Sequence, residues 1–516
     1  MRKLPGSLLL PAFLVVYAAF FIGSVDGRLA GDDHFALAHA AALLAGDRLN
    51  VDLFDPGVPL QVVVSAVGQL ASGSRTIAEV LIALSLRIIG LVSVYMLTKK
   101  LVHNRLAGVL VAATVAVGLM NETIYGPEKV ALYPIAVLAV WRYLEGRLSP
   151  YVLSLIIATA ALLRHDHGVY VAICMALAVS LGPRPVASLL KVGGGTLVLM
   201  APWLLWVQST EGIASYVTSR IVFAMSIGLG SERPFGFRTP LLSTANAARW
   251  LWHVALLTTV VALIMSIRRR SIPVIALAGT SVVTALGLMR KDAQAVEVAA
   301  IWMPLLVWLI WNVRWYGKVA LTCVAAVSIA AVITMNDAVS ELTQIAQEGG
   351  GLRRRLRSAV QFHMTTPPID AYAPVDPEET SEGRTVIRYV YECLRPSDRV
   401  WETAMWFPVT YYSQRRPVWH LYWDHSLKQD EASQLQFLDW LKGEQAPVII
   451  AHSDDLLVAF RRYPLIRSYV TANYREITSA RFEEYRKDGN RIRLLADMRR
   501  VPTGRFEPLD LPCFSP

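Results

Sequence analysis

The stretch "SLLLPAFLVVYAAFFIGSVDGRLAGDDHF", residues 7–35, joins a long apolar run to two adjacent carboxylates, Asp32 and Asp33. A helix needs about 20 mostly apolar residues to cross the hydrocarbon core of a bilayer, and this run is long enough. No small-residue cleavage site follows the run, so we interpret it as a retained membrane span rather than a signal peptide. The chain therefore enters a membrane near its start and places an acidic pair just beyond the first crossing.

Runs of the same kind recur through the first two thirds of the chain. Of the 516 residues, 54% are hydrophobic and only 17% are charged, a balance that is unusual for a soluble protein. These runs predict an α-helical polytopic membrane protein with about eleven transmembrane helices. The predicted spans are residues 7–25, 78–98, 106–120, 130–143, 152–163, 169–181, 192–207, 250–266, 272–289, 299–311 and 319–334.

The distribution of Lys and Arg predicts the orientation of these spans. Cytoplasmic loops of membrane proteins carry an excess of basic residues. With a cytoplasmic N-terminus, every inner loop is short and basic, as in the arginine triplet at 268–270, and most acids fall in outer loops. The net charge of +10 is then loop charge rather than a sign of nucleic-acid binding. We predict a multi-pass plasma-membrane protein whose C-terminal part is extracytoplasmic.

Two domains are predicted. Residues 1–334 form the transmembrane domain, with a long first outer loop at 26–77, and residues 335–516 form an extracytoplasmic soluble α/β domain. The first outer loop contains two apolar stretches, "HFALAHAAALLA" (34–45) and "DPGVPLQVVVSAVGQLASG" (55–73). Both are too short to span a bilayer, so we expect helices that lie in the membrane interface.

The C-terminal domain shows alternating strand and helix patterns. The segments "DRVWETAMW" (398–406) and "APVIIAH" (446–452) are typical of buried strands. The segment "FEEYRKDGNRIRLLA" (482–496) carries an Asp-Gly turn and predicts a hairpin. Cys393 and Cys513 either form a disulfide, if this domain lies outside the cytoplasm, or stay free.

The acidic pair Asp32-Asp33 has two interpretations. A carboxylate beside an apolar wall and a cation can act as a general base toward an acceptor hydroxyl or amine. Alternatively, one aspartate caps the helix that begins near His34, because an N-cap carboxylate accepts amide hydrogen bonds and favours the positive helix end. Read alone, the pair favours the cap.

The segment "LLRHDHGVYV" (162–171) places Arg164, His165, Asp166 and His167 between two apolar runs. Charged groups at membrane depth are costly and usually functional. The two histidines are two positions apart, which on a helix directs them to different sides and argues against a shared metal ion. We favour a cationic cluster for a phosphate, with Arg164 as the forked donor; the alternative is an interfacial turn with snorkelling ends.

Two further outer junctions carry charged residues. "YGPEKVALYP" (125–134) places Glu128 and Lys129 at the start of the fourth span, which the helix dipole alone would also explain. "GLMRKDAQAVEVAAIWMP" (287–304) places Arg290 and Asp292 before a late span, either to hold a lipid phosphate or as an interfacial turn.

Several common sites are missing from the sequence. There is no P-loop motif, no strand-linked G-x-G-x-x-G, no H-E-x-x-H and no Cys/His set with zinc spacing. Nothing in the sequence therefore predicts a nucleotide site or a cofactor, and a divalent metal ion is left open.

Together these features resemble the GT-C superfamily of integral-membrane glycosyltransferases, and more closely its bacterial branch related to protein O-mannosyltransferases and the aminoarabinose transferase of lipid A. The features that carry the resemblance are, in chain order, Asp32-Asp33 after span one, the turn and short helix that begin at Asp55, Glu128 opening span four, Arg164 ahead of Gly168, and "RKDAQAVEVAAIWMP" before a late span. The chain departs from the aminoarabinose transferase pattern at "DPGVPL", where Asp55 replaces a basic residue.

The resemblance implies a bacterial inner-membrane enzyme that takes a sugar from a polyprenyl-phosphate donor and transfers it, with inversion, to an extracytoplasmic lipid, glycan or protein acceptor. It implies a catalytic role for Asp32, Asp33 and Glu128, with Asp32 as the base. It implies donor-phosphate binding by Arg164, Lys129, Arg290, His165 and His167. Acceptor or orienting roles fall to His34, Asp166 and Asp292, with no metal ligands assigned.

Two other classes of protein stay open. A transporter or flippase of a lipid or glycan would use intramembrane charges as a substrate path. Against it, the ionisable residues gather on one predicted face, and the halves show no inverted repeat. A non-catalytic assembly protein would use its C-terminal domain to bind a partner.

Overall fold

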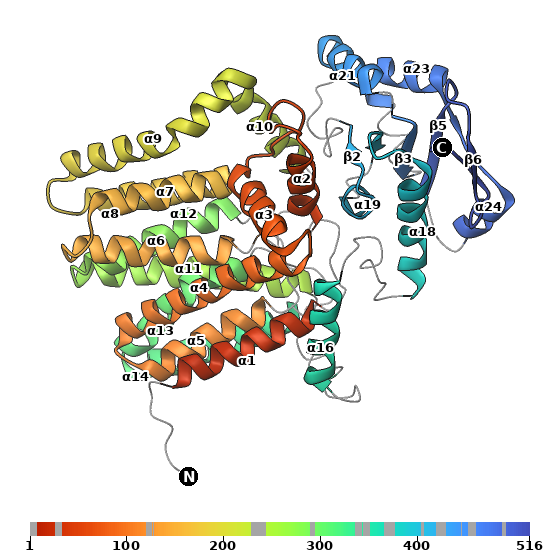
Figure 1. Ribbon diagram of the computed structural model, residues 1–516. Helices are drawn as coiled ribbons and strands as arrows, with labels where there is room; N and C mark the ends of the chain where they lie inside the picture. The colour runs from red at the N-terminus through yellow and green to blue at the C-terminus, as the bar shows by residue number, and fades with distance from the viewer. Residues whose placement is uncertain are drawn as a thin grey trace. The chain divides into compact units, whose positions relative to one another are not determined.

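The computed structural model describes residues 8–25, 34–119, 126, 128–228, 244–288, 295–335, 343, 351–365, 377–403, 407–418, 430–444, 446–452, 461–487 and 492–515. Its helices (Figure 1) are α1 (Leu9–Ser24), α2 (His34–Leu44), α3 (Pro59–Ser72), α4 (Ile77–Val102), α5 (Arg105–Gly118), α6 (Glu128–Leu144), α7 (Pro150–Leu163), α8 (His165–Ser180), α9 (Pro185–Thr210), α10 (Ile213–Gly228), α11 (Thr244–Arg268), α12 (Ile272–Leu288), α13 (Ala295–Asn312), α14 (Trp315–Met335), α16 (Gly351–Met364), α18 (Pro377–Cys393), α19 (Phe407–Ser413), α21 (Glu431–Glu444), α23 (Pro464–Asn473) and α24 (Ala480–Lys487). Its strands are β1 (Arg399–Glu402), β2 (Arg416–Pro417), β3 (Val448–His452), β4 (Tyr474–Glu476), β5 (Ile492–Asp497), β6 (Gly504–Phe506) and β7 (Leu511–Cys513).

Every predicted membrane span falls on a helix. Within the described residues, α4, α9, α11 and α14 are long and apolar enough to cross a membrane, and α1, α5, α7, α12 and α13 are shorter apolar helices. The predicted fold class, a polytopic α-helical membrane protein with a C-terminal α/β part, is confirmed. The count of crossings stays a prediction.

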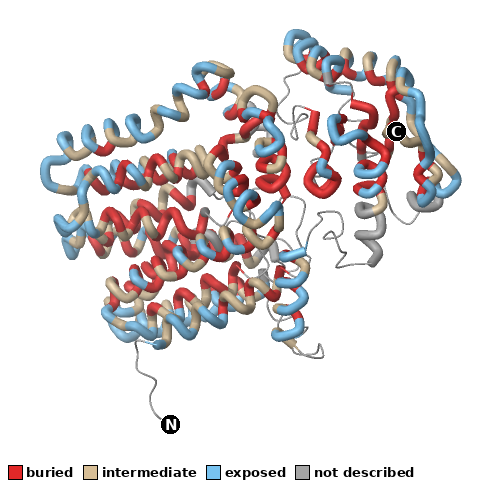
Figure 2. The backbone as a smooth tube through the Cα atoms, viewed as in Figure 1, coloured by how far each residue is buried: buried red, intermediate tan, exposed pale blue. Residues whose placement is uncertain are grey.

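Two of the long helices are mostly surface. In the most apolar 18-residue stretch of α9 only 11% of the residues are buried, and in that of α14 only 17%. Apolar side chains such as Leu190, Val198 and Leu205 therefore lie exposed along α9, which is pale over much of its length in Figure 2. Exposed apolar surface of this extent marks contact with lipid or a partner, and the length of these helices favours lipid.

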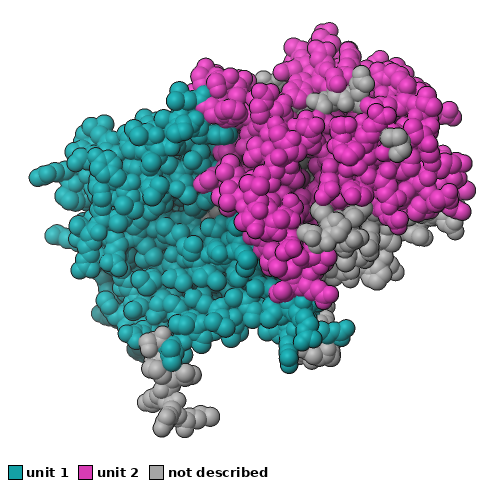
Figure 3. Space-filling model, in the orientation of Figure 1, with its two compact units in different colours: residues 1–25, 80–205, 230–359 teal, residues 26–79, 206–229, 360–516 magenta. Residues whose placement is uncertain are grey.

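The chain divides into two compact units, coloured separately in Figure 3 and described here one at a time. Unit 1 comprises residues 1–25, 80–205 and 230–359, and unit 2 comprises residues 26–79, 206–229 and 360–516. The predicted boundary between residues 334 and 335 is a different division, and it stays a prediction.

Unit 1 is a helical bundle. Helix α11 packs against α12, α13 and α14, and α7 pairs with α8. Helices α4 and α6 approach to backbone contact, because a Cβ atom on Gly90 would lie 2.9 Å from the carbonyl oxygen of Val130. Only glycine allows this approach, which brings the middle of α4 beside the first turn of α6.

Unit 2 joins three segments that are far apart in sequence. The first outer loop contributes α2 and α3, the stretch after α9 contributes α10, and the C-terminal part contributes the sheet and its helices. Helices α2 and α3 pack on each other, and α19 packs on α2.

The sheet of unit 2 has five strands in the order β2-β1-β3-β5-β4. Strand β1 runs parallel to β2 and β3, whereas β5 runs antiparallel to β3 and β4. Trp401 and Ile449, on β1 and β3, lie fully buried in one apolar cluster with Phe437 of α21. The strands predicted at 398–406 and 446–452 are thereby confirmed.

The hairpin predicted at 482–496 is wrong in its first arm. That arm is helix α24, and only the second arm, β5, is a strand. The physical reason is an N-cap: the hydroxyl of Ser479 accepts a hydrogen bond of 3.0 Å from the amide of Phe482, which starts a helix. Phe482 is then the buried contact of that helix.

Cys393 and Cys513 form a disulfide, with Cα atoms 4.4 Å apart. The bond ties the end of α18 to β7. The amides of Phe514 and Ser515 both donate to the carbonyl of Cys393, each at 2.8 Å, so the chain end is held by backbone contacts as well.

Candidate functional site

The predicted site residues fall into two groups. Asp32, Asp33, Arg290 and Asp292 lie outside the described residues, as does the side chain of Glu128, whose backbone begins α6. The structure describes His34, in unit 2, and a set in unit 1: Lys129, Arg164, His165, Asp166 and His167.

The "RHDHG" segment is a helix-to-helix turn of a single residue. Arg164 is extended, with φ −163° and ψ 116°, between the end of α7 and the start of α8. A Cβ on Gly168 would lie 2.3 Å from the Cα of Ala161, so only glycine lets the two helices meet this closely. The tight turn therefore depends on the last residue of the motif.

A salt bridge closes the turn. Arg164 Nε and Asp166 Oδ1 are 3.0 Å apart, and the same oxygen accepts the amide of His167 at 2.9 Å. Asp166 lies in the first turn of α8, where the helix dipole favours a carboxylate. The pair holds the Arg164 guanidinium at the N-terminal end of α8.

The two histidines contact different groups. His165 Nδ1 bonds to the carbonyl of Ala161 at 2.5 Å, whereas the buried His167 bonds through Nδ1 to the hydroxyl of Tyr133, also at 2.5 Å. The described part of the chain contains no group of three His, Cys, Asp or Glu placed to hold a metal ion.

The N-terminal turn of α6 carries a buried cation. Lys129 is 7% exposed, and Tyr133, one turn further on, is 1% exposed. Residues four apart share a helix face, so Lys129 lies on the side that meets α8 through Tyr133 and His167. This buried cation lies near the positive end of the helix, where negative charge is favoured.

A second buried cation was missed from the sequence. Arg87, in the middle of α4, is fully buried; its Nη1 donates to the carbonyl of Leu119 at 2.6 Å and its guanidinium lies 4.7 Å from the Phe21 ring centre. An arginine inside an apolar run is itself a signal for function or structure. Arg87 lies inside a predicted span, whereas the cations predicted to be functional lie at loops and span junctions.

Contacts link these residues to one end of the unit 1 bundle. Phe21 and Leu119 lie at the C-terminal ends of α1 and α5, and Val130 lies at the N-terminal end of α6. All three touch α4 through Arg87 or Gly90. This end of the bundle is the one predicted to face outward.

In unit 2, Asp55 of the first outer loop has a structural role. The Asp55 carboxylate accepts the amides of Gly57 and Val58 at 2.8 and 2.7 Å and the hydroxyl of Tyr216 at 2.7 Å. The replacement of a basic residue by Asp55, noted in the sequence, thus fastens the start of α3 to α10.

Asp47 joins the loop to the sheet. Its buried carboxylate pairs with Arg399 at 2.7 Å and with Arg416 at 3.0 Å, from β1 and β2. Nothing in the local sequence pattern indicates this contact, because the partners are 352 and 369 positions away.

No protein-family model and no curated protein sequence matches the chain. Among solved structures, it is similar to ArnT from Cupriavidus metallidurans in the apo state, with 13% identity, 95% of this chain and 97% of that chain covered, and a TM-score of 0.49. It is also similar to an Archaeoglobus fulgidus oligosaccharyltransferase. The complex with Zn and sulfate gives 13% identity, coverage of 90% and 72%, and a TM-score of 0.44. The form tethered to an acceptor peptide with the NVT sequon gives 11% identity, coverage of 88% of this chain and 70% of that chain, and a TM-score of 0.42.

With TM-scores below 0.5, the similarities assign this chain no donor, no acceptor and no residue role.

Proposed function

We propose that this chain is a membrane glycosyltransferase that transfers a sugar from a polyprenyl-phosphate donor to an extracytoplasmic acceptor. The observation that carries the proposal is the pair of cations in unit 1, Lys129 buried at the start of α6 and Arg164 fixed by Asp166 at the start of α8. Guanidinium and ammonium groups make strong charge-assisted hydrogen bonds to phosphate oxygens. The motifs shared with GT-C enzymes support the same assignment.

In this proposal Asp32 removes the proton of the acceptor hydroxyl. The acceptor oxygen then attacks the anomeric carbon from the face opposite the phosphate, and the bond between that carbon and the phosphate oxygen breaks. The electron pair leaves with the polyprenyl phosphate, whose growing charge Lys129, Arg164 and Arg290 stabilise. Asp33 and Glu128 orient the acceptor, and His167 holds Tyr133 through a hydrogen bond.

The Cys393–Cys513 disulfide supports the proposed placement of the C-terminal part. Disulfides persist in oxidising compartments and are rare in the cytosol. The disulfide thus supports, within the proposal, a C-terminal part on the same side of the membrane as the acceptor.

The test uses the full-length protein in proteoliposomes with a panel of polyprenyl-phosphate monosaccharides and a membrane lipid extract as acceptor. Release of free polyprenyl phosphate should require Asp32, so Asp32→Asn should abolish it. The control Asp52→Asn alters an acid of the same loop that pairs with the exposed Arg48, and should retain activity. Movement of labelled lipid across the bilayer without release of polyprenyl phosphate would contradict the proposal and favour a flippase.

A further inference from the structure

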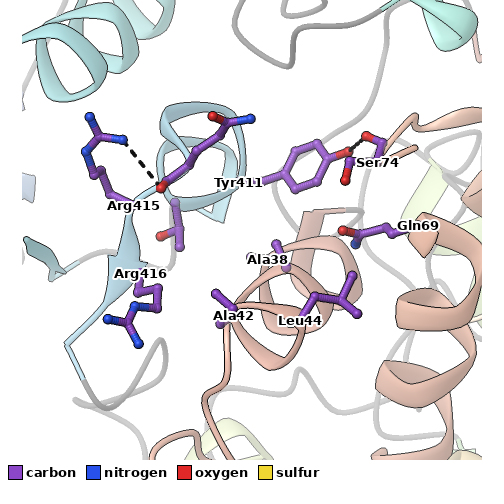
Figure 4. A pocket seen from close by; sticks show the side chains of 12 residues that line it. Ala38, Ala42, Leu44, Gln69, Ser74, Tyr411, Arg415 and Arg416 are labelled. Atoms are coloured by element: carbon purple, nitrogen blue, oxygen red, sulfur yellow. Dashed lines mark hydrogen bonds between the residues drawn. The ribbon is translucent and has the colours of Figure 1, made fainter. Parts of the chain in front are cut away.

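A pocket of about 200 Å³ opens within unit 2 between α2 and the α19–β2 connection (Figure 4). We call it the α2–α19 pocket and define it by Ala38, Ala42, Gln69, Tyr411, Gln414 and Arg416. Its inner residues, Ala38, Gln69 and Tyr411, are at most 3% exposed, whereas Gln414 on the rim is exposed. It is thus a recess with a buried floor and an open mouth.

Small side chains create the recess. Helix α2 presents Ala38, Ala41 and Ala42 toward it, at the spacing of one helix face, and Ala45 follows just after the helix. A larger residue at any of these positions would fill the space against Tyr411. Helix α3 packs on α2 as well and contributes Gln69 to the lining, so the recess lies among α2, α3 and α19.

A polar group lies on the floor. Gln69 donates through Nε2 to the carbonyl of Leu37 at 2.9 Å, which fixes the plane of its amide. Figure 4 shows the amide end turned toward Ala38, at the pocket. Within the described part of the chain nothing donates to its Oε1, so a buried acceptor is available to a ligand hydroxyl.

The rim is positively charged. Asp47 is shared by Arg399 and Arg416, so two guanidinium groups face one carboxylate. Arg416 uses Nη1 for this pair, and no described residue engages its Nε or Nη2. Its side chain is 32% exposed, so a two-donor edge is left at the pocket for a planar anion.

Arg415 adds a second positive charge to the lining. Its Nη2 donates to the carbonyl of Tyr391, in the last turn of α18, at 2.6 Å and to that of Leu394, just after α18, at 2.7 Å. Burial lowers the pKa of Arg415 below its ordinary value, because its charged form is desolvated. An anion in the pocket would relieve this cost.

We propose that the α2–α19 pocket binds one monosaccharide residue that bears an anionic group, as part of the acceptor glycan. An aromatic ring and an alanine wall cover the apolar face of a sugar, Gln69 accepts a hydroxyl, and Arg416 takes the anion. An acyl chain would leave Gln69 Oε1 unpaired. Drug-sized ligands occupy pockets of about 300–1,000 Å³, so this smaller pocket suits a single ring.

The proposal rests on the proposed function for the identity of the acceptor, but its test does not need turnover. Binding is measured by saturation-transfer NMR on the full-length protein in nanodiscs, with methyl glucuronide, glucose 6-phosphate, methyl glucoside and octanoate as probes. We expect one of the two anionic sugars to bind about tenfold or more tightly than methyl glucoside. Preference for the glucuronide identifies a carboxylate, and preference for the phosphate identifies a phosphosugar. Equal binding of the neutral sugar, or binding of octanoate alone, would overturn the proposal.

Variants distinguish a site from a nonspecific surface. Ala41→Leu fills the recess without touching the ion pairs and should abolish binding. Arg416→Gln should weaken the binding of the anionic sugars to the affinity of methyl glucoside. The matched control is Arg48→Gln, which changes an exposed arginine of the first outer loop that does not line the pocket. Retained binding in Ala41→Leu would overturn the pocket assignment even if sugar transfer through Asp32 persists.

Discussion

His34 and Tyr412, 378 positions apart in sequence, share a buried hydrogen bond of 3.1 Å between Nε2 and the phenol oxygen. His34 is the first residue of α2, and it directly follows the acidic pair proposed to carry the reaction. The neighbouring Tyr411 donates to the carbonyl of Ser74, just after α3. Helix α19 of the C-terminal part thus holds both the start of α2 and the end of α3.

We predict that Tyr412→Phe lowers sugar transfer several-fold with little change in the apparent affinity for the donor. The substitution removes the hydrogen bond to His34, worth about 1 kcal/mol of stability, and leaves the ring in place. Transfer rate and KM would be measured in proteoliposomes beside a thermal unfolding curve. Tyr469→Phe is the matched control, because among the described residues its hydroxyl contacts only the exposed end of Arg499. Equal activity of the two variants would refute a positioning role for Tyr412.

The second prediction concerns the dependence of stability on pH. Burial lowers the pKa of His39 from 6.5 to about 4, although its ring nitrogens lie 3.0 and 3.2 Å from the carbonyls of Phe35 and Phe54. Below about pH 6.5 the unfolded chain binds a proton that the folded ring does not, so the stabilisation is present above that pH. It is lost as the pH falls toward about 4, by about 3 kcal/mol in total.

The measurement compares denaturant unfolding of the wild type with that of His39→Gln at several pH values. Glutamine stays neutral, so the free-energy difference between the two proteins should shrink as the pH is lowered from about 7 to about 4. Other titrating groups affect both proteins alike and cancel. A difference that is constant over this range would show that His39 does not titrate as described.

The third prediction tests the ion pairs of Asp47. Removing one partner of a buried pair leaves a charge without its partner, so Asp47→Asn should destabilise unit 2 by about 3–5 kcal/mol. Asp52→Asn, which breaks an exposed pair with Arg48, should cost at most about 1 kcal/mol. Unfolding of unit 2 would be followed by hydrogen exchange of the backbone amides of β1, beside the buried Trp401. A double-mutant cycle with Arg399→Gln should show coupling, and additive effects would exclude a direct interaction.

How much the sequence predicts depends on the range of the interactions. Apolar runs are local, and they located the helices of unit 1 together with β1 and β3. The association of α2 with α19, and of Asp47 with Arg399, follows from packing between segments hundreds of residues apart, which no periodic pattern encodes. Arg87 was not predicted for a related reason. Its side chain binds the carbonyl of Leu119 and lies beside the ring of Phe21, and neither residue is near it in sequence.

The local sequence pattern also gave one wrong prediction, the hairpin at 482–496. The Asp-Gly pair at 488–489 predicts a turn between strands, but the Ser479 cap upstream starts a helix that occupies the first arm. In the "RHDHG" segment the local sequence was sufficient. His165 and His167 are two positions apart on a helix, which predicts that they contact different groups, as they do. The roles assigned to Asp32, Glu128 and Arg290 stay predictions.

The last prediction uses two glycines as a matched pair. A Cβ on Gly168 would meet the Cα and Cβ of Ala161 at 2.3 and 2.6 Å, whereas a Cβ on Gly194 of α9 would meet nothing within 4 Å. Gly168→Ala should therefore force α7 and α8 apart at a cost of about 1–3 kcal/mol, and displace Arg164 from Asp166. Gly194→Ala should be neutral or slightly stabilising, because alanine favours a helix interior by about 1 kcal/mol. The unfolding temperature and the donor affinity, measured for both variants in the same nanodiscs, check the prediction. Gly168→Ala should lower the unfolding temperature and weaken donor binding. If it unfolds at the normal temperature yet binds donor weakly, the effect lies at the Arg164 site itself. Normal unfolding together with normal donor affinity would show that the close approach of the two helices is not required.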